Sequence, residues 1–153
     1  MDCDFTKFLL AQDYEYSNAL SQIKAGRKTS HWMWYIFPQI EGLGFSEKSQ
    51  LYAINDLEEA ALYLQHEILG ERLREISNEL LLLTETNIKL VFDSPDDKKL
   101  KSSLTLFAQV EETSDNVFVK LIDKYFDGNY DGKTIKILNK KAFQKMNIKA
   151  SKV

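Results

Sequence analysis

Residues that interrupt helices are scarce in this sequence. Its 153 residues include six glycines and two prolines. Because Gly and Pro are the residues least compatible with a helix interior, their scarcity favours helices over a sandwich of short strands. We therefore expect an all-α fold.

Cysteine, histidine and long apolar runs are scarce as well. The single cysteine, Cys3, excludes an intramolecular disulfide, and the chain shows neither a Cys/His cluster with zinc spacing nor a leading signal peptide. Its longest apolar run falls far short of the roughly 20 residues that span a bilayer. We expect a cytoplasmic protein with no membrane partner, no metal and no cofactor.

Charge of neither sign dominates the whole chain. The formal net charge is −3, whereas domains that bind nucleic acid are usually strongly basic, so we do not expect nucleic acid as a partner. The end of the chain differs, because seven lysines and no acidic residue follow Asp131. This segment is predicted to be a cationic arm that frays beyond Met146.

Apolar residues repeat at helical spacing along most of the chain. The pattern predicts helices over residues 4–24, 46–53, 55–66, 68–83, 95–110, 114–126 and 134–143. Their expected N-caps are Asp4, Ser46, Asn55, Ser94 and Ser114. We expect a compact bundle of about five or six helices in a single globular domain over residues 1–140, with a lysine-rich tail over 141–153. Association into a homo-oligomer is left open.

The segment 27–45 has no clean helical period, so we expect it to form one long ordered loop. Within it, residues 30–39 read SHWMWYIFPQ. Two interpretations of these rings remain open. Large aromatic side chains usually pack in the core, but Trp32, Trp34 or Tyr35 could instead stack on a nucleobase or nicotinamide ring.

Polar residues around the aromatic run suit a phosphorylated ligand. Arg27, Lys28 and Ser30 could bind phosphate oxygens, although Arg27 and Lys28 could equally end the first helix and complement its dipole. His31 is a candidate base, because neighbouring cations favour the neutral imidazole; a lone histidine is more often a cap or a core residue. The residues expected to close the pocket are Gln39, Gly42 and Gly44.

The segment 94–107, SPDDKKLKSSLTLF, is the second candidate region. Asp97 is a candidate catalytic acid, although acidic residues in a first helical turn are also explained by the helix dipole. Helix starts attract anions, and the residues expected to contact phosphate here are Lys101, Ser102, Ser103 and Thr105. Ser and Thr within helices often bond back to the preceding turn instead.

Three segments together resemble the domain of unknown function 1810 family, a group of small, mainly prokaryotic proteins. They are GRKTSHWMWYIFPQIEGLGFS at 26–46, EAALYLQHEILGERLRE at 59–75 and SPDDKKLKSSLTLF at 94–107. The resemblance extends from about residue 8 to residue 134 and implies a compact, mostly helical, cytoplasmic protein, but no reaction. The chain departs from the family at Asp93, Lys98 and Lys101, where a glycine, an aliphatic residue and an arginine are frequent. A fainter similarity, in the mix of an aromatic loop with a lysine and serine helix, is to the NADAR-type glycosidases that act on ADP-ribose adducts.

These observations favour a pocket between segments 27–46 and 94–105 for a small nucleotide-like ligand. The ligand would be derived from NAD or ADP-ribose, and it would be either sequestered or hydrolysed at a glycosidic or phosphoester bond. Absence of a P-loop, a nucleophile elbow, HExxH, CxxC and a dinucleotide fingerprint disfavours other enzyme classes. The alternative is an interaction module for protein or nucleic acid with no small-molecule site.

Overall fold

The fold is built from helices, as expected. The computed structural model describes residues 3–111, 113 and 115–151, leaving out the side chains of residues 150 and 151. Across these residues it contains eight α-helices, one 3-10 helix and no strand, apart from an isolated bridge between Ile40 and Ile54. Within the same part of the chain, no helix is both long and apolar enough to cross a membrane.

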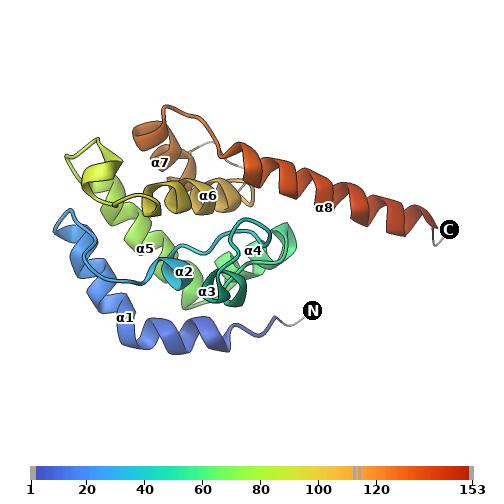
Figure 1. Cartoon of the computed structure of the whole chain (residues 1–153), viewed down its shortest axis with the longest axis horizontal. Helices are drawn as coiled ribbons and strands as arrows, with labels where there is room; N and C mark the ends of the chain where they lie inside the picture. Colours follow the sequence, from blue (N-terminus) through green and yellow to red (C-terminus); the bar gives the residue numbers. More distant parts are fainter. Residues whose placement is uncertain (1–2, 112, 114, 152–153) are drawn as a thin grey trace.

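Six helices are longer than two turns, in agreement with the predicted number. They are α1 (Thr6–Lys24), α4 (Leu57–Gln65), α5 (Leu69–Leu82), α6 (Asp96–Ala108), α7 (Val117–Phe126) and α8 (Gly132–Ser151). The single turns α2 (Met33–Ile36) and α3 (Glu47–Leu51) lie in the connection from α1 to α4, and the 3-10 helix η1 (Ile88–Leu90) precedes α6. In Figure 1, α1 runs along the lower edge, α6 and α7 lie above it, and α8 leaves the body along the long axis.

A row of aromatic rings joins four helices in the core. The rings of Phe8 and Tyr63 lie 5.3 Å apart, those of Tyr63 and Phe107 5.5 Å, and those of Phe107 and Phe118 5.9 Å. Tilted and edge-to-face contacts at this spacing stabilise a core beyond the burial of area alone. The row therefore fixes α1, α4, α6 and α7 relative to one another.

Three predicted helix starts are one residue early, and the first is that of α1, where Phe5 and not Asp4 occupies the N-cap position. Asp56, not Asn55, caps α4, since its Oδ1 accepts a hydrogen bond from the Glu59 N–H at 2.8 Å. At α6, Pro95 itself occupies the N-cap position, where Ser94 was expected. Because proline carries no side-chain acceptor, α6 begins without a side-chain cap.

The remaining expected caps are Ser46 and Ser114. Ser46 caps α3 by accepting from the Ser49 N–H at 3.1 Å, as predicted. Ser114 lies outside the described residues, and α7 is capped by Asn116, whose Oδ1 accepts from the Val119 N–H at 2.9 Å.

The last helix is much longer than predicted, and it continues past Met146, beyond which a frayed end was expected. α8 continues without a break from Gly132 to Ser151. Its first turn is fixed to the body, because Asp131 accepts from the N–H of the buried Thr134 at 3.0 Å and donates its own N–H to Thr105 Oγ1 at 2.9 Å. Helical structure thus extends through most of the lysine-rich tail.

Candidate functional site

One side chain of α1 shapes the start of the aromatic loop. Gln22 Oε1 accepts hydrogen bonds from the backbone N–H of Thr29 at 2.9 Å and of Ser30 at 3.3 Å, and from Trp32 Nε1 at 2.8 Å. Its Nε2 donates to Ser30 Oγ at 2.8 Å. Gln22 was not predicted to be important, since a glutamine within a helix carries no signal of contacts seven to ten residues away.

Two of the predicted phosphate ligands are occupied by carboxylates. Arg27 pairs with Asp93 at 2.9 Å, and Lys28 pairs with Asp96 at 2.8 Å. Only 8% of the Lys28 side chain is exposed. These ion pairs neutralise both cations and attach the aromatic loop to the segment that leads into α6, so they bring the two predicted halves of the site together.

The aromatic run has two different fates. Trp32 and Phe37 are fully buried and pack against Phe92, and Tyr35 is also buried, with its ring 5.3 Å from that of Tyr52. Burial raises the pKa of Tyr35 to about 12. The packing interpretation therefore accounts for these three rings.

Trp34 is the exception among the Trp, Tyr and Phe rings of residues 30–39. It is only partly buried, and its ring lies 4.7 Å from Lys48 Nζ and 5.6 Å from Lys99 Nζ. Ammonium groups within about 6 Å of an indole centre are attracted by its negative face. Trp34 is therefore an accessible aromatic surface in a positively charged setting.

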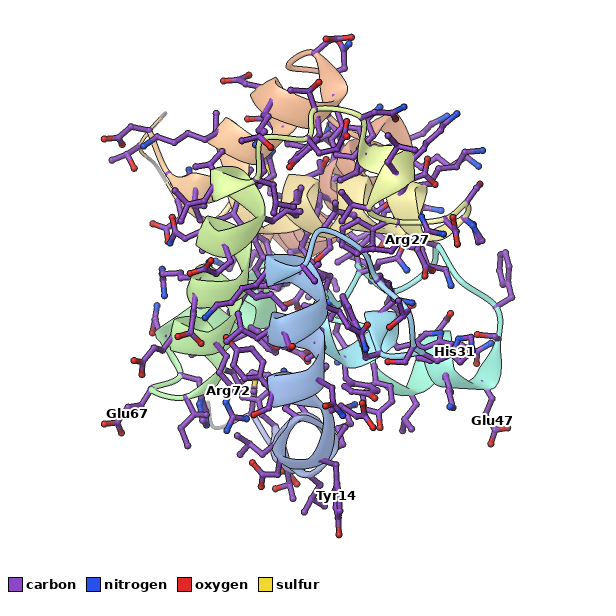
Figure 2. All side chains as sticks on the ribbon, turned by 90° about the vertical axis from the view of Figure 1, so that its left-hand side faces the viewer. Tyr14, Arg27, His31, Glu47, Glu67 and Arg72 are labelled. Atoms are coloured by element: carbon purple, nitrogen blue, oxygen red, sulfur yellow. The ribbon has the colours of Figure 1, made fainter. Side chains whose placement is uncertain are left out.

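A cavity of about 360 Å³, here named the tryptophan cleft, opens beside Trp34. Its lining is formed by residues 28–34, residues 93–96 and Lys99. The predicted residues Lys28, Ser30, His31, Trp32 and Trp34 thus share one wall, although Trp32 is buried. Figure 2 shows His31 and Arg27 on the same side of the molecule, away from Arg72 and Glu67.

A second cavity of about 540 Å³, here named the lysine cleft, adjoins the first. The two clefts have Pro95 and Lys99 in common. The lining of the lysine cleft comprises Gln39, Leu43, Pro95, Lys98, Lys99, Lys101, Ser102, Asp131, Gly132 and Lys133. In the described part of the chain none of its four lysines forms an ion pair, and its carboxylate, Asp131, already accepts two hydrogen bonds from Thr134.

Other candidate residues lie elsewhere. Gly42 and Gly44 line a separate cavity of about 380 Å³ beside α3, which also includes Gln39. At Gly44 a Cβ atom would lie 2.5 Å from the Cβ of Ser49, so this glycine permits close packing of the loop on α3. The two glycines do not line the tryptophan or lysine cleft.

The helix hydroxyls are mostly engaged by the backbone. Ser102 Oγ donates to the Lys98 carbonyl at 3.1 Å, and Thr105 Oγ1 donates to the Lys101 carbonyl at 2.8 Å. Ser103 is fully buried, and its Oγ has no hydrogen-bond partner among the described residues. Back-bonding therefore explains Ser102 and Thr105, and of the three hydroxyls the lysine cleft includes only that of Ser102.

The two candidate catalytic groups are not brought into one cavity. His31 is exposed in the wall of the tryptophan cleft. Asp97 is 4% exposed, lines neither cleft, and its Oδ1 has no hydrogen-bond partner in the described residues. In that same portion of the chain, no group of three or more His, Cys, Asp and Glu side chains is arranged to hold a metal.

Comparisons with known proteins identify relatives but no activity. The model of a family described as "Protein of unknown function (DUF1810)" matches residues 2–138. The solved structure of the conserved hypothetical protein Rv1873 from Mycobacterium tuberculosis is similar to this chain, with 42% sequence identity and a TM-score of 0.85 over 88% of this chain and 95% of that one. A search of curated proteins finds no match. The faint similarity to NADAR-type glycosidases therefore finds no support among these relatives.

Proposed function

This chain belongs to the DUF1810 family, and we propose that its tryptophan and lysine clefts together bind one small, phosphorylated, ring-bearing ligand. A ligand derived from NAD or ADP-ribose has this chemistry, because it joins flat rings to a diphosphate. The observation that carries the proposal is Trp34, an accessible indole in the tryptophan cleft that is flanked by Lys48 and by Lys99, a residue common to both clefts.

The ring of the ligand would lie against Trp34. Stacking of a base on an aromatic side chain is worth about 1 to 3 kcal/mol in proteins that bind single-stranded nucleic acids. The neighbouring rings of Trp32 and Tyr35 are buried, so the proposal assigns stacking to Trp34 alone. Ser30 and His31 line the same cleft and would contact the hydroxyls of the ligand.

The phosphates would lie in the lysine cleft. Lys98, Lys99, Lys101 and Lys133 supply positive charge there, and the start of α6 at Pro95 adds the favourable end of a helix dipole. Arg27 and Lys28 are paired with carboxylates, so their role would be to hold the loop rather than to bind phosphate. Lys99, common to both clefts, would sit between ring and phosphate.

We propose sequestration of this ligand rather than hydrolysis. Binding requires an aromatic surface and positive charge, and Trp34 and the four lysines of the lysine cleft would supply them. Hydrolysis by a paired acid and base requires both groups within reach of the scissile bond. His31 lines the tryptophan cleft, whereas Asp97 lines neither cleft. Incubation with ADP-ribose followed by chromatography should therefore return the ligand intact.

A thermal-shift titration tests the proposal. The probes are ADP-ribose, NAD, ADP, AMP and inorganic phosphate, each added to the natural chain, to Trp34→Ala and to the matched control Trp34→Phe. A ligand at 100 times its Kd stabilises the native state by about 2.7 kcal/mol, which should raise the melting temperature by about 5 to 10 °C in a domain of this size.

The two variants separate stacking from other effects. We expect the shift to persist in Trp34→Phe, which keeps an aromatic face, and to disappear in Trp34→Ala. A shift of equal size in all three proteins would remove Trp34 from the site. Failure of every nucleotide to shift the natural chain would overturn the proposed function.

A further inference from the structure

The outer half of α8 differs from the rest of the molecule. The family match ends at residue 138, whereas α8 continues to Ser151. Figure 1 shows this part of the helix running out beyond the other helices along the long axis. A separate role for this segment is therefore independent of the proposed ligand clefts.

Two lysines fix which face of α8 looks toward the body. Lys141 pairs with Glu41 at 3.5 Å, and Lys145 pairs with both Asp56 and Glu58 at 3.3 Å. These residues are four apart, so they lie on one face of the helix, one turn above the other. The opposite face is thereby turned toward solvent.

Large apolar side chains occupy that solvent face. Phe143 is 63% exposed and Met146 is 69% exposed. Being three residues apart, they share one face, and with about 3.6 residues per turn that face is roughly opposite Lys141.

Cations flank this apolar pair on both sides. By the same helical spacing, Lys140 lies beside Phe143 and Lys149 lies beside Met146, while Lys136 lies two turns before Phe143 on the same face. These three lysines make no ion pair with any residue that the structure describes. The sequence places no acidic residue after Asp131, so the face combines exposed apolar groups with positive charge only.

We propose that this face of α8 binds reversibly to an anionic phospholipid surface. Phe143 and Met146 would enter the headgroup boundary, while Lys136, Lys140 and Lys149 would meet lipid phosphates. Exposed apolar side chains next to unpaired lysines are a combination that also occurs on helices that lie in the plane of a membrane. Lysines alone would suit a nucleic acid equally well, and it is the exposed Phe and Met that favour lipid.

The expectation of no membrane partner rested on the absence of a spanning run, and a helix lying on the surface needs no such run. The net charge of −3 for the chain does not prevent this contact. Charges are screened over about 8 Å at physiological ionic strength, and the outer part of α8 extends away from the body (Figure 1). The local charge of the helix therefore determines its interaction with a surface.

Co-sedimentation of the full chain with vesicles tests this inference. We expect the protein to sediment with vesicles of phosphatidylcholine mixed with phosphatidylserine, and to be released as salt is raised. Lys136→Gln with Lys140→Gln should lower the partition coefficient about 30-fold, which corresponds to about 1 kcal/mol per lysine. Phe143→Ser with Met146→Ser removes both apolar side chains and should abolish sedimentation.

Matched controls come from α1, where Lys24→Gln and Leu10→Ser change exposed residues of the same kinds and should leave sedimentation unchanged. Circular dichroism checks that each variant stays helical. Three results would overturn the inference: no sedimentation with the mixed vesicles, equal sedimentation with pure phosphatidylcholine, or sedimentation that survives Phe143→Ser with Met146→Ser. Binding of duplex DNA that persists in the double serine variant would assign the face to nucleic acid instead.

Discussion

At the scale of single residues, Gln22 carries an unusual share of the local structure. Its amide accepts three hydrogen bonds and donates one, all to residues 29–32. One of these partners is the indole N–H of the fully buried Trp32. Loss of this side chain would leave donors of the aromatic loop without a partner.

We predict that Gln22→Ala lowers the free energy of unfolding by about 1 to 3 kcal/mol, the cost of leaving the indole N–H of the buried Trp32 without an acceptor. Gln22→Glu keeps the accepting oxygen and should cost less. Urea denaturation of both variants measures the difference. Equal losses in the two variants would contradict the assigned role of Oε1.

The buried phenol of Tyr35 gives the fold a sensitivity to alkaline pH. Burial raises its pKa to about 12, above the value of about 10 for an unfolded tyrosine. The folded state therefore holds a proton that the unfolded state releases between these values. The resulting contribution to stability is present below about pH 10 and is lost as the pH rises toward 12.

We predict that the urea midpoint falls as the pH rises from about 10 to about 12, and that it falls less steeply in Tyr35→Phe. The substitution should cost little at neutral pH, because the hydrogen bond that the Tyr35 hydroxyl donates to the His31 carbonyl is long, at 3.4 Å. Burial also raises the pKa of Tyr125 to about 12, so some of the alkaline loss should remain. A slope unchanged by Tyr35→Phe would refute the prediction.

At the scale of the helices, the start of α4 shows what decides between two adjacent capping residues. Asn55 and Asp56 are both good N-caps in isolation. The backbone of the preceding residue, Ile54, is fixed by hydrogen bonds with Gln39 and Glu41 at 2.8 Å. This contact with a distant segment places Asp56, with its extended backbone, at the cap.

We predict that Asp56→Ala destabilises the protein by about 1 kcal/mol, the usual cost of losing an N-cap. Asp56→Asn keeps the capping oxygen and removes the charge that pairs with Lys145, so it should cost less. Asn55→Ala serves as the neighbouring control and should have little effect. Thermal unfolding of the three variants ranks them, and a larger loss from Asn55→Ala would restore the cap that the sequence suggested.

Most of each helix, in contrast, was predictable from local pattern. The apolar period and the breakers located α1, α5, α6 and α7 to within a few residues. The end of α8 was not predicted, because its outer half has weak apolar periodicity and is supported by ion pairs of Lys141 and Lys145 with distant segments. A sequence pattern does not contain such contacts.

At the scale of the whole molecule, the core ends well before the chain does. The fully buried residues extend to Thr134 in α8, and the side chains of residues 142–149 are exposed. The outer half of α8 is joined to the body by surface ion pairs, which usually contribute about 0 to 1 kcal/mol each. The globular domain should therefore be independent of this segment.

We predict that a chain truncated after Leu138 folds with a melting temperature within about 5 °C of the natural chain, since about 1 kcal/mol shifts the melting temperature of such a domain by 2 to 4 °C. Truncation after Asp131 is the control, because it also removes the buried Thr134 and should destabilise the protein much more. Calorimetry compares the two. Unfolding of the longer truncated chain at room temperature would show that the tail belongs to the domain.

The sequence by itself determined the helical class, the positions of most helices and the ordered loop between α1 and α3, because helical period and helix breakers are local properties. It also indicated the two segments that line the candidate site. Only the tertiary structure decided which rings are buried, that Lys28 is neutralised by Asp96, and that Lys133 joins the lysines of α6 in one cleft. Each of these depends on contacts between residues far apart in the chain, and such contacts are set by the packing of whole helices.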